Sequence, residues 1–338
     1  MRFVANLFSP IPIAKNSHSL GWSDYWARKL DATIIRNFNR VSSNDIVYVD
    51  HGVNFSGSLN LFGGFSDEMF SQLSTLIKVS PKLVSLDIEM PDYADFLISR
   101  IGRQSSSNSL DEKFCLKFKS LLDKAGCRKL ADTHPTWVTF GDSHTIAYAH
   151  PNSEIHRTNG LTLFRFLQDY ETLLPDFRLP RYSKLKKLTI VLGSIDIRHH
   201  IFRQPDPWTS VRELVSGLDK ICRALQKEFG LDIELGIPVP VEHEGRRVPT
   251  TGYYKGSPFF GSREERLKMT IRVGNLMSQT RFKIVSPPIE WYQMNGEDYA
   301  TSIMERGGSV HISPVYYRSG STHTLEWNSL KTKFGKLL

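Results

Sequence analysis

LTIVLGSID, residues Leu188–Asp196, carries the clearest signal of fold class in this chain. Its first five residues are all aliphatic or β-branched, which is typical of a strand buried inside a parallel sheet. A glycine, a serine and an aspartate follow that strand at short spacing. Because the carboxyl ends of parallel strands meet at one edge of a sheet, where ligands bind, we expect functional residues in the loops after such strands.

Strand and helix patterns alternate on both sides of this stretch. Short β-branched or apolar runs predict further strands at Asp45–Asp50, Lys82–Ile88, Trp137–Phe140, Leu231–Val239 and Phe282–Val285. Amphipathic spacing and capping residues predict helices after Ser66, at Tyr93–Ile101, at Leu110–Ala125, from a capping box of Ser210 and Glu213 to Gly230, and from Ser262 with Glu265. This alternation predicts an α/β fold, a three-layer sandwich with a mostly parallel sheet.

The weakest part of the pattern is a Ser/Asn-rich patch at Gln104–Ser109. We expect a domain boundary near residue 130. This division leaves an N-terminal α/β region at residues 1–130, a candidate binding wall, and a second domain at residues 131–338. The residues leave open whether the N-terminal region has its own sheet or extends the second one.

Composition excludes several classes of protein. Hydrophobic residues make up 40% and charged residues 23% of the 338 residues, which favours a packed core over disorder. Three cysteines are too few for a disulfide scaffold. No apolar run approaches the roughly 20 residues of a membrane span, and no export signal opens the chain. We therefore expect a cytoplasmic protein with no membrane contact, and the motifs indicate no metal and no cofactor.

The basic residues outnumber the acidic ones, 43 to 35, which gives a formal net charge of +8. A positive surface attracts polyanions at long range. No nucleic-acid-binding motif accompanies the charge. The expected partner is therefore a polar or anionic substrate, with nucleic acid or a glycan as alternatives, and the oligomeric state stays open.

Gly141-Asp142-Ser143-His144 directly follows the strand expected at Trp137–Phe140. A serine at a tight turn from strand to helix lies beside backbone N–H groups, and this setting suits a nucleophile and an oxyanion. The alternative is that Asp142 or Ser143 only caps the following helix.

The Gly-Asp-Ser block is followed in the chain by Asn159-Gly160, by the Gly193–Asp196 block and by Val310-His311. This order resembles the SGNH (GDSL-type) hydrolase family over roughly residues 136–318. The resemblance implies an SGNH/flavodoxin-like sandwich and a hydrolase, esterase or acyl transferase. Its substrate would be a polar ester or an acylated, sugar-bearing or anionic compound.

The resemblance also implies roles for individual residues. Ser143 would be the nucleophile and His311 the general base. The backbone N–H groups of Ser143 and Gly160, with the block that begins at Gly193, would form the oxyanion hole. Two positions differ from the family pattern: Ile195 replaces the asparagine donor, and Gly308 replaces the aspartate that orients the histidine.

Residues close to Ile195 are candidates to take over the roles of the family's asparagine and aspartate. If Ile197 points into the core, Asp196, Arg198 and His199 project into the cleft. Arg198 would then replace the missing donor by binding an anion at two points. Asp196 would orient a histidine, and His199 would be an alternative base. The competing interpretation is a structural Asp–Arg pair with surface histidines.

A second cluster, Asp50-His51-Gly52-Val53-Asn54, follows a predicted strand and leads into a glycine-rich loop. This layout can hold a phosphate or nucleotide. We therefore predict substrate-binding roles for Asp50, His51 and Asn54, and also for Asp142 and His144 in the other block. A glycine-rich surface turn is the alternative. A functional loop here would favour a group transferase that modifies nucleic acid or a glycan, and a non-catalytic nucleic-acid-binding protein is a third hypothesis.

Overall fold

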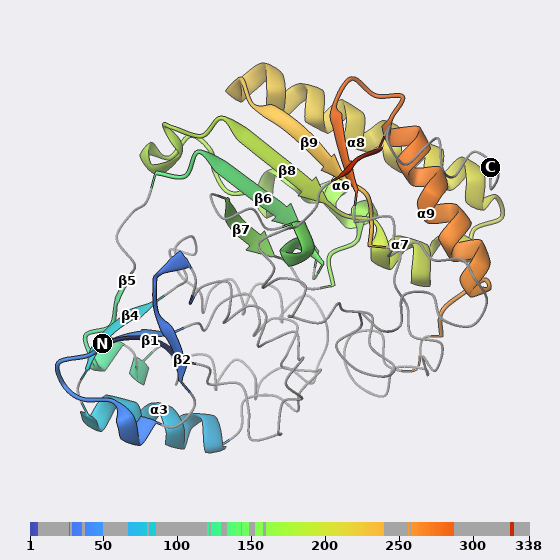
Figure 1. Cartoon of the computed structure of the whole chain (residues 1–338). Coiled ribbons are helices and arrows are strands. Elements are labelled where there is room, and N and C mark those ends of the chain that lie inside the picture. Colours follow the sequence, from blue (N-terminus) through green and yellow to red (C-terminus); the bar gives the residue numbers. More distant parts are fainter. Residues whose placement is uncertain are drawn as a thin grey trace. The chain divides into compact units, whose positions relative to one another are not determined.

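A computed structural model describes residues 1–5, 27, 29–35, 38–49, 67–79, 81–85, 120–121, 123–129, 134–142, 144–148, 153–157, 160–239, 256, 258–286 and 325–327. The chain divides into an N-terminal unit, residues 1–133, and a C-terminal unit, residues 134–338. Each unit contains its own sheet with helices (Figure 1). Nearly all neighbouring strands run parallel, so the predicted α/β class with a mostly parallel sheet is confirmed.

The N-terminal unit has a five-stranded parallel sheet in the order β2-β1-β3-β4-β5. Its strands are β1 (Arg2–Ala5), β2 (Thr33–Ile35), β3 (Ile46–Val49), β4 (Lys82–Ser85) and β5 (Arg128–Lys129). The 3₁₀ turn η1 (Phe38–Arg40) precedes β3, and helix α3 (Asp67–Val79) joins β3 to β4. Phe3, Val47 and Leu83 lie side by side in register and share one core with Leu73 and Leu76 of α3. The helix expected after Ser66 thus begins at Asp67.

The C-terminal unit has a six-stranded sheet in the order β11-β10-β9-β8-β6-β7. Its strands are β6 (Trp137–Gly141), β7 (Glu154–Arg157), β8 (Lys187–Val191), β9 (Asp232–Gly236), β10 (Lys283–Ser286) and β11 (Leu325–Glu326). Only the β10–β11 pair among these described strands is antiparallel. The LTIVL run lies largely in β8, between β6 and β9, as its apolar character predicts.

Four of the described helices share the core on one face of this sheet. They are α6 (Leu163–Leu173), α7 (Ser194–His199), α8 (Pro207–Phe229) and α9 (Arg263–Met277). Phe140, Ile190 and Leu235 are neighbours in register and join that core. On the other face, Tyr148 of the 3₁₀ turn η2 (Thr145–Tyr148) lies over Gly236, where an added Cβ would come within 3.3 Å of its ring.

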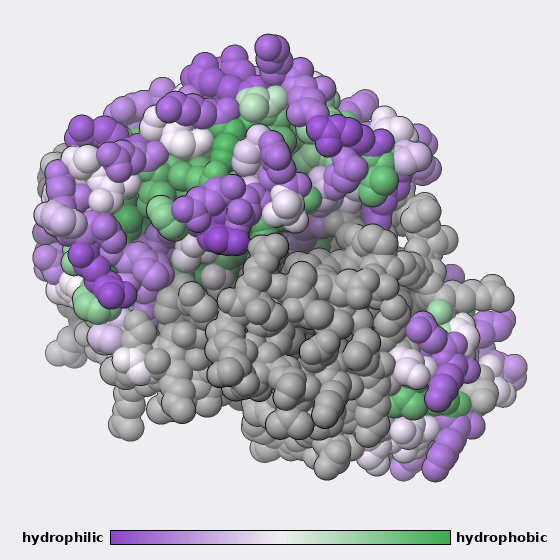
Figure 2. All heavy atoms as spheres, turned by 180° about the vertical axis from the view of Figure 1, so that it is seen from behind, coloured by the Kyte–Doolittle hydropathy of each residue, from purple (hydrophilic) through white to green (hydrophobic). Residues whose placement is uncertain are grey.

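The amphipathic pattern of α8 decides which of its residues reach the surface. Val211, Val215 and Leu218 are buried, whereas Lys220 and Arg223 are exposed. Figure 2 shows the same principle over the described part of the chain, where hydrophilic residues cover most of the visible surface and apolar ones lie between them. No helix in the described ranges is both long and apolar enough to cross a bilayer.

The expected start of α8 was wrong by about one turn. The N-cap is Asp206, whose Oδ1 accepts hydrogen bonds from the amides of Trp208 and Thr209, and Pro207 is the first helical residue. Ser210 instead donates its hydroxyl to the carbonyl oxygen of Asp206. The helix starts at Asp206-Pro207 rather than at Ser210. Asp206 accepts from free amides of the first turn, and proline has no N–H group that would need a partner there. The predicted end at Gly230 and the predicted capping box of Ser262 and Glu265 are confirmed.

Candidate functional site

The carboxyl ends of β6, β7 and β8 meet at one edge of the C-terminal sheet. Gly141 at the end of β6 lies in register with Arg157 of β7 and Val191 of β8. The blocks Asp142–His144 and Gly193–Asp196 therefore leave the sheet side by side. This is the edge where parallel α/β folds bind ligands.

Gly141 allows β6 and its following turn to pass close to β8. A Cβ atom at this position would lie 2.0 Å from the carbonyl oxygen of Val191 and 2.8 Å from Oγ1 of Thr145. The next amide, that of Asp142, donates a hydrogen bond of 3.1 Å to the same carbonyl oxygen. Only glycine fits here, so the first residue of the Gly-Asp-Ser block is required by packing.

The fully buried side chain of Asp142 joins two segments. Its Oδ1 accepts a hydrogen bond of 2.8 Å from the amide of His144, and its Oδ2 accepts one of 2.5 Å from the hydroxyl of Ser194. The Thr145 hydroxyl donates to the Asp142 carbonyl oxygen at 2.5 Å. Asp142 thus closes its own turn in the way the capping alternative predicts, and it also ties that turn to α7. Whether it binds substrate stays a prediction.

Ser143 and His311 lie outside the described residues. The predicted pairing of a serine nucleophile with a histidine base therefore stays a prediction. Asp142 and His144, which flank Ser143 in the sequence, both lie at the carboxyl edge and are both buried.

Gly193 turns the chain from β8 into α7 through a backbone φ of 109°. Side chains other than hydrogen are strained in this left-handed region, and a Cβ would also approach Pro238 to 3.3 Å. The residue that follows, Ser194, is buried and accepts a hydrogen bond of 3.3 Å from Nη2 of Arg198. Sequence reasoning did not single out Ser194, although its place in the Gly-x-x-Asp block marked it.

The Asp196 carboxylate binds the N-terminus of α6. Its Oδ2 accepts a hydrogen bond of 2.7 Å from the amide of Leu163, and its Oδ1 accepts one of 3.1 Å from Phe164. Helix N-termini have amides without partners in the helix, and an anion satisfies them. The expected role of orienting a histidine receives no support from these contacts, because both oxygens bind backbone amides.

Burial raises the pKa of Asp196 from 3.8 to about 6. The amide donors of α6 lower this pKa, and the nearby charge of Asp142 raises it further. Asp196 therefore keeps its proton to a higher pH than an exposed aspartate does.

Arg198 and His199 pack around Phe259. The Arg198 guanidinium lies 5.9 Å from the centre of the Phe259 ring, and the His199 ring contacts it edge-on at 4.9 Å. The amide of Phe260 donates to the carbonyl oxygen of Arg198 at 3.0 Å. His199 is buried, so the alternative of surface histidines is wrong for this residue. Ile197 lies in the core, which is the condition on which the cleft-facing roles of Asp196, Arg198 and His199 depend.

The other predicted site residues fall into two groups. Gly160 is exposed, with a left-handed φ of 75° and open space around the position of a Cβ. Its carboxyl-edge position after β7 agrees with the oxyanion prediction without testing it. Asp50, His51 and Asn54 lie outside the described residues.

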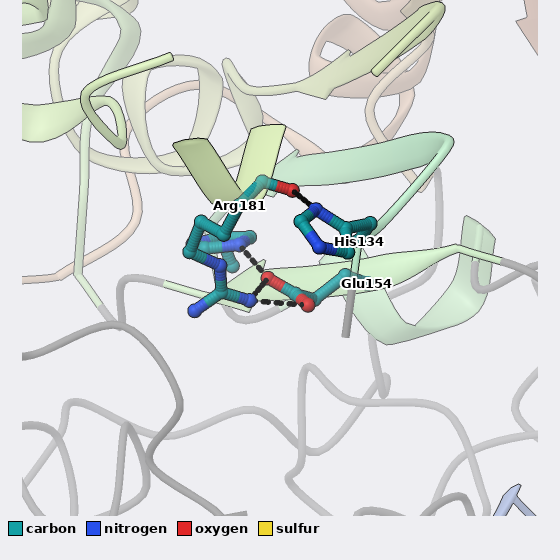
Figure 3. Close-up of polar contacts among 4 residues, drawn as sticks. His134, Glu154 and Arg181 are labelled. Carbon is teal, nitrogen blue, oxygen red and sulfur yellow. Dashed lines mark hydrogen bonds and ion pairs between the residues drawn. The ribbon is translucent and has the colours of Figure 1, made fainter. Parts of the chain in front are cut away.

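A second polar cluster, built around the buried side chains of Glu154 and Arg181, lies at the edge strand β7 (Figure 3). Nη2 of Arg181 donates to both carboxylate oxygens of Glu154, at 2.9 and 2.8 Å, and Nε2 of His156 lies 3.0 Å from Oε1. Nδ1 of His134 lies 3.1 Å from the Arg181 carbonyl oxygen. Glu154 is the first residue of β7. It therefore lies at the amino ends of the parallel strands, whereas the candidate site lies at their carboxyl ends. We therefore assign this cluster a structural role, anchoring the 3₁₀ turn η3 (Pro180–Tyr182).

A third cluster surrounds Glu234 on the face of the sheet that carries η2. Oε1 of Glu234 lies 2.6 Å from Nζ of Lys187 and 3.2 Å from Nζ of Lys283. Thr189 donates to its Oε2 at 3.2 Å and accepts from the Trp137 indole at 2.9 Å. These side chains come from the middle and the start of strands, so they too lie away from the carboxyl edge. Neither cluster was predicted, because each brings together residues from segments that are far apart in the sequence.

In the parts of the chain that the structure describes, no three His, Cys, Asp or Glu side chains converge as metal ligands. Comparisons with known protein families and with curated protein sequences found no match to this chain. The chemistry of the candidate site is therefore argued from its own residues.

Proposed function

We propose that the C-terminal unit is an SGNH-type serine enzyme that hydrolyses or transfers the acyl group of a polar ester. The observation that carries the proposal is the hydrogen bond between Asp142 and Ser194. It joins the Gly-Asp-Ser-His block to the Gly-Ser-Ile-Asp block, the two segments on which the resemblance chiefly rests, at the carboxyl ends of neighbouring strands.

In the proposed reaction, the Ser143 hydroxyl attacks the ester carbonyl carbon and passes its proton to His311. The carbonyl oxygen becomes an oxyanion, which the backbone N–H groups of Ser143 and Gly160 stabilise. The bond to the leaving alcohol then breaks, and His311 returns the proton to that alcohol. Attack by water or by another alcohol releases the acyl group and restores Ser143.

The test is covalent labelling by a fluorophosphonate probe, followed by peptide mapping. We expect Ser143 to be labelled in the unchanged protein and labelling to disappear in Ser143→Ala. Ser183→Ala is the control, because Ser183 is an exposed serine in the same unit. Equal labelling of Ser143→Ala and the unchanged protein would contradict the proposal, as would the absence of labelling in both.

A second candidate function, transfer of a group from a phosphorylated donor, is favoured by the strand order of the N-terminal unit. In the order β2-β1-β3-β4-β5, the chain leaves β1 toward one side of the sheet and leaves β3 toward the other. Such a switch point opens a crevice at the carboxyl ends of the two strands, and ligands bind there in open parallel sheets. Asp50 and the glycine-rich segment follow β3 directly in the sequence.

Thermal unfolding with nucleotides and nucleotide sugars tests this second function. We expect a higher Tm with a bound donor and a smaller increase in Asp50→Ala. The control is Asp31→Ala, since Asp31 lies in the turn before β2 and away from the β3 carboxyl end. An unchanged Tm with every nucleotide and nucleotide sugar would leave the serine enzyme as the only supported function.

A further inference from the structure

We infer that Ser194 is a positioning residue for Ser143, which it affects through the Asp142 side chain and the His144 amide. The inference rests on the proposed function, because it concerns the same serine. The roles assigned above give no function to the Ser194 side chain. Its hydroxyl, however, contacts both Arg198 of α7 and Asp142, the residue that precedes Ser143 in the chain.

The position of Ser194 is fixed by the backbone on which it lies. Gly193 adopts a left-handed conformation, and Ser194 begins α7 immediately after it. Ser194 is 3% exposed, so its hydroxyl exchanges no hydrogen bond freely with bulk water. The amide of Ile197 donates to the Gly193 carbonyl oxygen at 3.0 Å, which completes the first turn of α7. The hydroxyl therefore projects from a rigid start of a helix.

The hydroxyl of Ser194 acts as both donor and acceptor. It donates to Oδ2 of Asp142 at 2.5 Å, and it accepts from Nη2 of Arg198 at 3.3 Å. The positive guanidinium polarises the hydroxyl and so strengthens its donation to the carboxylate. The charge of Arg198 therefore affects the strength of the hydrogen bond between Ser194 and Asp142.

Asp142 connects the Ser194 hydroxyl to the backbone that follows β6. Its second oxygen, Oδ1, accepts a hydrogen bond of 2.8 Å from the amide of His144, so the carboxylate contacts the chain two positions further on. A fully buried carboxylate needs donors on both oxygens. Without the Ser194 hydroxyl, Oδ2 loses this hydrogen bond of 2.5 Å, and we expect the carboxylate to rotate or to take up a proton. Either change weakens its hold on the His144 amide.

The direct test compares Ser194→Ala with Ser194→Thr, which keeps the hydroxyl. We expect Ser194→Ala to slow fluorophosphonate labelling of Ser143 by about 10- to 100-fold, the effect of one hydrogen bond to an ionised group. Ser194→Thr should recover most of that rate. Ser286→Ala is the matched control, since Ser286 is a buried serine at the end of β10. Equal labelling rates in Ser194→Ala and Ser286→Ala would overturn the inference.

Amide hydrogen exchange gives a readout that does not depend on activity. Ser194→Ala should speed exchange of the His144 amide, which donates to the Asp142 side chain. It should leave the Asp142 amide unchanged, because that amide donates to the Val191 carbonyl oxygen. Equal acceleration of both amides would mean general loosening and would overturn the positioning role.

A double-mutant cycle separates action through Asp142 from independent damage. Asp142→Asn and Ser194→Ala remove the same interaction, so the double variant should label scarcely more slowly than the slower single variant. Rate losses that multiply would contradict the inference. If the unchanged protein shows no labelling at Ser143, the proposed function fails, whereas the exchange of the His144 amide still decides the role of Ser194.

Discussion

The hydroxyl of Ser194 and the carboxylate of Asp142 form a hydrogen bond of 2.5 Å, although 52 positions separate them in the chain. The strands that precede these two residues in the chain, β8 and β6, are direct neighbours in the sheet. The contact therefore depends on strand order, and it turns two separate loops into one connected structure. The stability and the chemistry of this edge should respond together when either residue changes.

Asp196→Asn should change how stability depends on pH. Burial raises the pKa of Asp196 from 3.8 to about 6, so between these values the folded state keeps a proton that the unfolded state releases. The contribution of this proton to the free energy of unfolding is complete below about pH 4 and is lost as the pH rises through 6. The loss for this residue is about 3 kcal/mol. Asparagine cannot titrate.

Urea unfolding at pH 4, 5, 6 and 7 measures this effect. The free energy of unfolding of the unchanged protein, minus that of Asp196→Asn, should fall as the pH rises through this range. Parallel curves for the two proteins would show that the carboxyl group titrates normally.

Gly141→Ala and Gly160→Ala should differ strongly in cost. The first places a Cβ 2.0 Å from a carbonyl oxygen, so β6 must separate from β8 and the C-terminal unit should fail to fold. The second meets no atom within 4 Å but strains a left-handed φ of 75°, which costs about 1–2 kcal/mol. Circular dichroism and thermal unfolding distinguish the two outcomes. Similar losses for both variants would mean that backbone strain, rather than the clash, dominates.

Glu154→Gln should destabilise the edge strand β7. The substitution leaves the buried guanidinium of Arg181 without its carboxylate partner, and breaking a buried pair in this way costs about 3–5 kcal/mol. Glu171→Gln is the control, because Glu171 is exposed. Chemical denaturation gives the free energies. Equal stability of the two variants would mean that solvent reaches the Arg181 side chain.

Asp206→Ala should lower the Tm more than Ser210→Ala does. Asp206 caps α8 with its side chain, and its hydrogen bonds to Thr209 and Trp208 hold the pKa of its carboxyl group below the ordinary value. The cap is therefore fully present at neutral pH and weakens as the pH falls through the range where Asp206 takes up a proton. A larger effect of Ser210→Ala would restore the capping box expected from the sequence.

Long, regular elements were predictable from local patterns. Hydrophobic periodicity was enough to predict the buried strand β8. Capping residues close in sequence predicted the end of α8 at Gly230 and the start of α9 at Ser262. Strands β1 and β2 were missed. β2 has only three residues, too few to show a period, and β1 (RFVA) has one β-branched residue, whereas β3 (IVYV), of the same length, has three.

Helix α6 was missed for a different reason. Thr162 caps its start locally, but its first free amides are satisfied by Asp196, which lies 33 positions away from Leu163. A non-helical residue, Asp169, also interrupts its pattern. A partner so distant in sequence leaves no local signature.

Amino-acid order was enough to show that Gly141–His144 and Gly193–Asp196 follow strands, because chain conformation over a few residues depends mainly on local sterics and hydrophobic spacing. Three-dimensional packing settled which of their side chains meet. It put Ser194 on Asp142 and Asp196 on α6, since such contacts depend on which strands become neighbours. That choice minimises exposed apolar surface over the whole unit, and no short window of residues contains it.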